Sequence, residues 1–374
     1  MLQPTTDRYD YTRILRRTDP TIAPLFLADL DQAVDVSAEM TGDLTATLPV
    51  IADIWQQVSP DPDTTANMLG VLVAFSTTAT AAGATTWHDV PTELITEFIH
   101  ASGRAAGEVC RLRKNVVHGA YLALYDAGLF DDVSPAAGID PVRGEIRTDE
   151  RGRRRGNAQQ TRTRKADADL VAIRTATHDE MLILRLATRL AVTSRTQQLP
   201  AAAVAICSSS ATAAEAAQVL WAHVQTDATP QMSLPGQLAV TGPTLHRIAP
   251  RTVALDPWAA EALTDWRTER KAKDKPGNAS RVASGQSVIY TGGKALDSDS
   301  ARIAADQQIG KAVEIADLNR ELGFSAGSLR LWAAARHVTE FASLIHAAAI
   351  AGIDPLELHR QMIRAADRRS PRCR

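Results

Sequence analysis

A strongly basic stretch with almost no apolar side chains constrains this fold more than any other part of the sequence. Residues 143–165 read RGEIRTDERGRRRGNAQQTRTRK and hold nine Arg or Lys residues against three acidic ones. Such a stretch cannot bury a core, so we expect an exposed connection between two separately folded parts. Its charge has two interpretations: a solvated linker, or a basic arm that lies on phosphates.

The charge of the chain is unevenly distributed. The 374 residues carry a net charge of −2, yet residues 1–100 hold fourteen acidic residues against four basic ones, a balance of −10. The remaining residues must therefore carry +8. The acidic N-terminal part cannot face a polyanion, whereas the rest of the chain can. We expect residues 1–85 to mediate self-association or to dock a protein partner.

Composition favours helices and excludes several classes of protein. Hydrophobic residues make up 45% of the chain but aromatic ones only 5%, and the apolar stretches are rich in alanine. No apolar run is long enough to cross a bilayer, and the first residues lack the apolar core of a signal peptide. The three cysteines are too far apart for a disulfide framework. We expect a cytoplasmic protein without membrane contact, metal ion or other cofactor.

Helical patterns separated by Pro, Gly and Asp breaks recur along the chain. They cover the last hundred residues and five earlier ranges: 21–84, 87–103, 111–129, 168–226 and 256–270. Gly128 is expected to end one helix, while Asp256 and Pro257 are expected to begin another. Short β-type runs at 232–255 predict a hairpin or small sheet, and residues 287–290 predict a further strand.

This order of parts resembles that of the tyrosine recombinases, or phage integrases. That family has a helical core-binding domain, a basic linker and a mostly helical catalytic domain with a small three-stranded sheet, which together form a C-shaped clamp around DNA. The resemblance spans residues 87–365. It rests on stretches that occur in the family's order: 87–99 with 115–129, ATAAEAAQVLWAHV at 211–224, RTVALDPWAAEAL at 251–263, and 298–318 with 327–353.

The resemblance implies a mainly helical α+β fold. It consists of helical N-terminal and core-binding domains and a tyrosine-recombinase-like catalytic domain with a small antiparallel sheet. The implied boundaries place a core-binding domain at 86–142, a basic linker at 143–166, and a degenerate catalytic-like domain at 167–374. Residues 1–85 lie outside the resemblance, and their acidic charge leads us to expect an added helical N-terminal domain there.

Most of the cations that the family's reaction requires are missing. The reaction uses a tyrosine nucleophile and a cage of cations around the phosphate. Matching the helix at 211–224 to the family places Thr212 at the first arginine, and a threonine supplies no charge. The lysine position falls at 245–248, which holds His246 and Arg247 but no lysine. Gly327 stands where the family has a histidine, and only Arg330 matches, at the second arginine.

The nucleophile is absent from its expected position. Ile353 follows Gly352 where the family has a histidine, and the tyrosine should lie near Met362. No tyrosine follows Tyr290 in this sequence. Because these groups act as a unit, losing several of them predicts a protein that is not an enzyme.

Arginines and lysines remain that could hold DNA. Each could also be a solvated charge or a member of an internal ion pair. The candidate phosphate contacts are Arg111, Arg113, Lys114, Arg153, Arg154, Arg155, Arg162, Arg164, Lys165, Arg247, Arg251 and Arg330.

The sequence therefore predicts a sequence-specific double-stranded DNA-binding protein without strand cleavage, such as a repressor or a phage or plasmid maintenance factor. One alternative is a helix-turn-helix at 314–336, with Gly323 in the turn and 325–336 as recognition helix. Another is an active recombinase with unorthodox catalytic residues, Tyr290 among them. A third is a structural or protein-binding scaffold.

Overall fold

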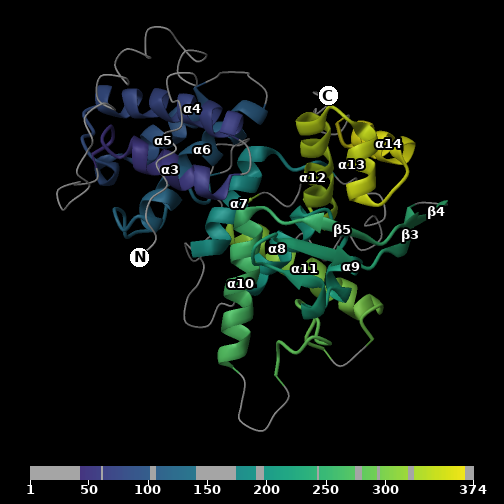
Figure 1. Cartoon of the computed structure of the whole chain (residues 1–374). Coiled ribbons are helices and arrows are strands. Elements are labelled where there is room, and N and C mark those ends of the chain that lie inside the picture. The colour runs from purple at the N-terminus through teal and green to yellow at the C-terminus, as the bar shows by residue number, and fades with distance from the viewer. Residues whose placement is uncertain are drawn as a thin grey trace, which may run out of the picture. The chain divides into compact units, whose positions relative to one another are not determined.

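The computed structural model describes nine ranges of the chain: 43–59, 62–101, 107–139, 174–190, 198–241, 244–273, 280–292, 295–318 and 324–366. The chain divides into two compact units, Met1–Ile146 and Arg147–Arg374 (Figure 1). This division falls within the expected basic linker at 143–166, which lies outside the described residues.

The first unit is a bundle of helices. Its described elements are α3 (Leu48–Val58), α4 (Pro62–Ala81), the 3₁₀ turn η1 (Trp87–Asp89), α5 (Thr92–His100) and α6 (Gly107–Asp126). The buried indoles connect distant parts of the bundle. Trp55 Nε1 donates to the Gly119 carbonyl at 3.1 Å, and Trp87 Nε1 donates to Thr47 Oγ1 at 2.7 Å. Each aromatic ring thus buries apolar area while its polar atom remains hydrogen-bonded.

The boundary expected at residue 85 is wrong. Helices α3 and α4 pack against α6, and α4 also packs against α5, so the four helices share one core. The Thr47–Trp87 hydrogen bond crosses the expected boundary. Residues 43–139 therefore belong to one helical unit, since neither helix pair can bury its apolar face without the other.

The second unit is mostly helical. Its described helices are α7 (His178–Leu190), α8 (Leu199–Ser208), α9 (Ala213–Gln218), η4 (Trp221–His223), α10 (Pro257–Ala272), α11 (Asp299–Ile315), α12 (Ala326–Phe341), α13 (Leu344–Ala351) and α14 (Pro355–Ala366). Helix α8 is buried along its length and packs against α7, α9, α10, α11 and α12. Such a helix, apolar on all sides, forms the centre of a core.

Two small antiparallel sheets accompany these helices. One has strands β1 (Val224–Gln225), β2 (Gln231–Leu234) and β5 (Arg251–Ala254) in the order β1-β2-β5, with Met232 opposite Val253. The other is a hairpin of β3 (Gln237–Thr241) and β4 (Thr244–Ile248). The expected mainly helical fold with a small antiparallel sheet is confirmed.

Two expected elements differ in the structure. Residues 287–290 form no extended strand, because only Ser287 makes a bridge, to Leu220. The helical range expected at 168–226 is interrupted at 209–212, between α8 and α9. Ser210 adopts a left-handed φ of 77° at this break, which ends α8.

The helix-turn-helix alternative is contradicted by the burial of α12. Ala326 and residues 328–334 are buried, among them Trp332 and Arg330. A recognition helix must present side chains to the major groove, whereas this helix packs against α8, α13 and α14. Gly323, expected in the turn, lies outside the described residues.

A buried ion pair joins α7 to the start of α10. Arg185 Nη2 lies 2.6 Å from Asp256 Oδ2, and its guanidinium lies over the rings of Trp258 and Trp332 at 4.8 and 5.4 Å. Asp256 also caps α10, because its Oδ1 accepts from Ala259 N at 2.9 Å, with Pro257 in the first turn as expected.

Candidate functional site

Thr212, at the position matched to the family's first arginine, is a helix cap in this chain. Its Oγ1 accepts from Glu215 N at 3.1 Å, and Glu215 Oε2 accepts from Thr212 N at 3.0 Å, which forms a capping box at the start of α9. Gln237 Nε2 from β3 donates to the same hydroxyl at 2.7 Å. The Thr212 hydroxyl oxygen therefore accepts two hydrogen bonds from within the fold.

Glu215, which is 0% exposed, pairs with Arg251 of β5. Arg251 Nη1 lies 2.5 Å from Glu215 Oε1, and Nη2 lies 3.2 Å from Oε2. The other Arg251 donors reach the carbonyls of Ile350, Ser210 and Ala249, at 2.5, 2.7 and 3.2 Å. All five guanidinium N–H groups are thus used, so Arg251 has no donor left for a phosphate.

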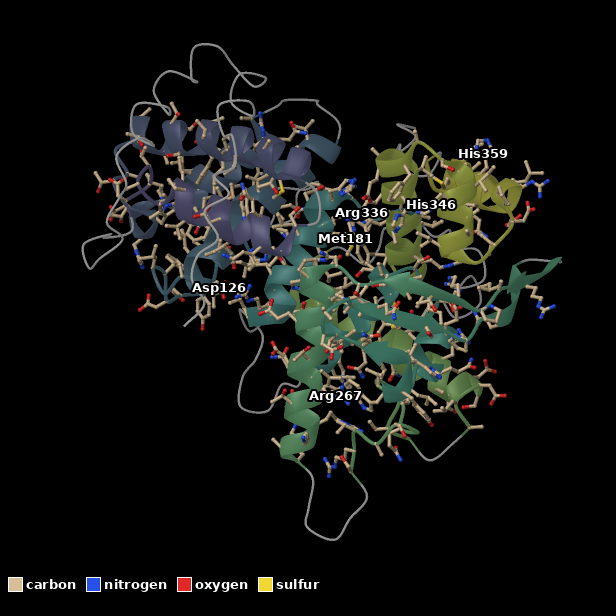
Figure 2. The ribbon with its side chains drawn as sticks, in the orientation of Figure 1. Asp126, Met181, Arg267, Arg336, His346 and His359 are labelled. Carbon is tan, nitrogen blue, oxygen red and sulfur yellow. The ribbon has the colours of Figure 1, made fainter. Side chains whose placement is uncertain are left out.

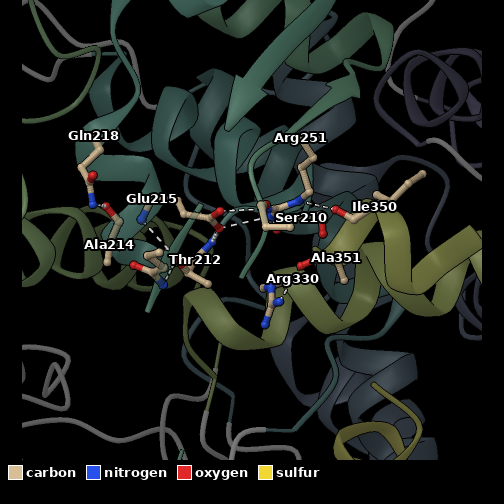
Figure 3. Close-up of polar contacts among 11 residues, drawn as sticks. Ser210, Thr212, Ala214, Glu215, Gln218, Arg251, Arg330, Ile350 and Ala351 are labelled. Atoms are coloured by element: carbon tan, nitrogen blue, oxygen red, sulfur yellow. Dashed lines mark hydrogen bonds and ion pairs between the residues drawn. The ribbon is translucent and has the colours of Figure 1, made fainter. Parts of the chain in front are cut away.

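Arg330 lies beside this pair but has fewer partners. Its Nη2 donates to the Ala351 carbonyl at 2.7 Å, next to the Ile350 carbonyl that Arg251 binds (Figure 3). Within the described ranges its buried Nε has no hydrogen-bond partner, and no carboxylate forms an ion pair with it. Burial lowers the pKa of Arg330 to about 10; Glu215 opposes this shift and Arg251 adds to it. The side chain therefore stays charged at neutral pH.

Gly352 brings α13 close to β5. Its φ is +68°, and a Cβ there would lie 2.8 Å from Arg251 Nη1 and 3.0 Å from the Ala249 carbonyl oxygen. Ala249 N donates to the Gly352 carbonyl at 2.8 Å. Only glycine fits this left-handed position at such a close approach.

The positions expected for the second histidine and the nucleophile are part of a hydrophobic cluster. Ile353 and Met362 pack, partly buried, against residues of α12, α13 and α14 that include Leu331, Ala348 and Leu358. At these two positions, where the family has reacting groups, this chain has apolar side chains that contribute to packing.

Three of the candidate phosphate contacts are buried, and one of them, Arg251, has no donor left for a phosphate. Lys114 is 5% exposed, Arg330 is 8% exposed, and the side chain of Arg251 is 7% exposed. For Arg251 the reason is its internal ion pair with Glu215. Taking such cations out of water requires internal partners, and a sequence does not reveal these.

The other candidates differ in their surroundings. Arg113 donates to the Phe98 carbonyl at 2.9 Å and lies over the Phe98 ring, so its guanidinium has an internal role. Arg111 is partly buried. Arg247, on β4, is exposed and stays a predicted contact. The linker candidates lie outside the described residues: Arg153, Arg154, Arg155, Arg162, Arg164 and Lys165.

The described ranges contain neither a metal-binding cluster nor a membrane-spanning helix. No group of three or more His, Cys, Asp or Glu side chains there could hold a metal ion. No described helix is both long and apolar enough to span a membrane.

No protein-family model matches the chain. No curated protein matches it.

Solved structures similar to this one are recombinases and integrases. XerA recombinase is 11% identical to this chain with a TM-score of 0.37, and the match covers 86% of this chain and 94% of the XerA chain. The integrase of mycobacterium phage Brujita is 14% identical with a TM-score of 0.31, and the match covers 88% of this chain and 95% of the integrase chain. The Tn1549 transposon integrase, in complex with a circular intermediate DNA, is 9% identical with a TM-score of 0.35. The match covers 87% of this chain and 99% of that integrase chain.

Proposed function

We propose that this chain is a sequence-specific double-stranded DNA-binding protein on a tyrosine recombinase scaffold, and that it does not cleave DNA. The observation that carries the proposal is Arg330, a buried cation without an ion-pair partner among the described residues. It occupies the position matched to the family's second arginine. A phosphodiester oxygen supplies the negative charge and the acceptor that this guanidinium lacks.

The chemistry of the neighbouring groups argues against cleavage. Thr212 carries no charge and caps a helix, and the donors of Arg251 are all used within the fold. Ile353 and Met362 pack in an apolar cluster. The pentacoordinate transition state of attack on a phosphodiester needs several cationic donors together with a nucleophile, and a single arginine does not replace that set.

A DNA-binding protein without cleavage suits several roles in the cell. It can repress transcription from its site, or it can maintain a phage or plasmid by occupying a recombination site. Phosphate contacts would supply most of the affinity, while base-edge contacts would select the site.

Replacing Arg330 with methionine is expected to weaken DNA binding by about 10- to 100-fold, because a charge-assisted hydrogen bond contributes about 1.5–3 kcal/mol. The measurement is a fluorescence-anisotropy titration with a DNA fragment selected by the wild-type protein, at one fixed salt concentration. Arg302→Met is the matched control, since Arg302 is exposed and pairs with Asp299 at 3.4 Å.

Thermal unfolding of both variants identifies any loss of affinity that comes from unfolding. Equal affinity of folded Arg330→Met and wild type would remove Arg330 from the proposed interface.

A further inference from the structure

The C-terminal half of α10 presents arginines whose guanidinium groups are held by tryptophan rings. Arg267 Cζ lies 5.7 Å from the ring centroid of Trp221, and Arg270 Cζ lies 5.5 Å from that of Trp266. Arg270 Nη2 also donates to the Arg281 carbonyl at 3.1 Å, which brings the loop after α10 to the helix. Figure 2 shows Arg267 on the part of α10 that extends away from the sheet.

Arg267 and Lys271 are exposed and one helical turn apart, so their side chains lie on the same face of α10. The described ranges contain no carboxylate in an ion pair with either. Three other exposed cations of this unit do pair with carboxylates: Lys273 with Glu269, Arg302 with Asp299, and Arg360 with Glu357. The charge at Arg267 and Lys271 is therefore not neutralised locally.

Two structural explanations account for part of this arrangement. A cation in the last turn of a helix interacts favourably with the helix dipole, which explains Arg270 and Lys271. Arg267 lies a turn earlier, where this effect has decayed. The cation–π contact with Trp221 does not by itself require an exposed guanidinium. In the described ranges the N–H groups of Arg267 have no hydrogen-bond acceptor.

We infer that Arg267 and Lys271 form a second phosphate-binding surface, which contacts the DNA backbone apart from Arg330. This inference rests on the proposed DNA binding. The planar guanidinium of Arg267 is pre-organised by Trp221, so it loses little conformational freedom when it binds a phosphate oxygen. Lys271 adds a point charge one turn along the helix. The two contacts give affinity and salt dependence without reading the sequence.

The experiment measures the salt dependence of binding to a short mixed-sequence duplex. The double variant Arg267→Gln/Lys271→Gln is expected to reduce the slope of log affinity against log salt by about 1.8, at about 0.9 per phosphate contact. The control Arg302→Gln/Arg360→Gln removes the same charge from ion-paired positions and is expected to leave the slope unchanged. The conservative variant Arg267→Lys is expected to keep the slope, since the charge is retained.

Each outcome has a distinct meaning. A wild-type protein that binds no duplex at low salt overturns the proposed function and this inference with it. If the wild-type protein binds the duplex but Arg267→Gln/Lys271→Gln keeps the full slope of log affinity against log salt, this inference alone is overturned. The surface would then serve a different partner. Equal losses in the test and control pairs show an effect of net charge, which also overturns it.

Discussion

Replacing Glu215 with alanine is expected to lower the free energy of unfolding by about 3–5 kcal/mol, the cost of leaving a buried charge without its partner. Glu215 is 0% exposed and binds Arg251 through both carboxylate oxygens. Its loss leaves two buried arginines, Arg251 and Arg330, near one another without a compensating charge. It also removes one half of the capping box of α9.

Urea denaturation of wild type and variant measures this effect. Glu261→Ala, at an exposed position on α10, is the control and should change stability by less than about 0.5 kcal/mol. The double variant Glu215→Ala/Arg251→Met should be less destabilised than the sum of its single variants, because the unpaired charge is then gone. A loss below about 1 kcal/mol in Glu215→Ala would contradict the ion pair.

Asp256→Asn is expected to destabilise the second unit by about 3 kcal/mol, because the buried Arg185 loses the carboxylate that lies 2.6 Å from its guanidinium. Asparagine is as good a helix N-cap as aspartate, so this substitution removes the charge of residue 256 but keeps the cap of α10. Arg185 is only 1% exposed at its side chain and lies against two indole rings, so it has no route to water.

The effect of Asp256→Asn should depend on pH. Burial raises the pKa of Asp256, but Arg185 and the Ala259 N–H outweigh it, so the net pKa lies below the ordinary value of 3.8. The carboxylate therefore contributes stability above about pH 4, and this contribution is lost as the pH falls through the lowered pKa.

We expect the stability difference between wild type and Asp256→Asn to be constant at neutral pH and to shrink below about pH 4. Denaturation at a series of pH values measures it, with the exposed Asp265→Asn as control. A difference that does not change with pH would mean that the Asp256 charge does not contribute.

Features that depend on local chemistry could be predicted from the sequence. Gly128 ends α6 with a φ of +69°, which a glycine adopts without strain. Asp256 and Pro257 begin α10, and the hairpin formed by β3 and β4 falls within the predicted β region, 232–255. Each of these is decided by a few adjacent residues.

Features that depend on distant partners could not be predicted. The boundary at 85 was wrong because the packing of α3 and α4 on α6 leaves no local signal. Arg251 looked like a surface cation because its partner Glu215 lies 36 residues earlier in the chain. The same holds for Arg185 and Asp256, which are 71 residues apart. An alignment of motifs identifies positions, but it does not show which charges neutralise one another.

The most direct test of DNA binding without cleavage is one incubation with two readouts. Pooled duplex fragments from the source genome and its mobile elements are incubated with the full chain across a salt series. Retained fragments are counted, and denaturing gels detect protein covalently joined to DNA. We predict selective retention of a few fragments with steep salt dependence and no covalent adduct. A covalent adduct, or no retention at low salt, would contradict the proposal.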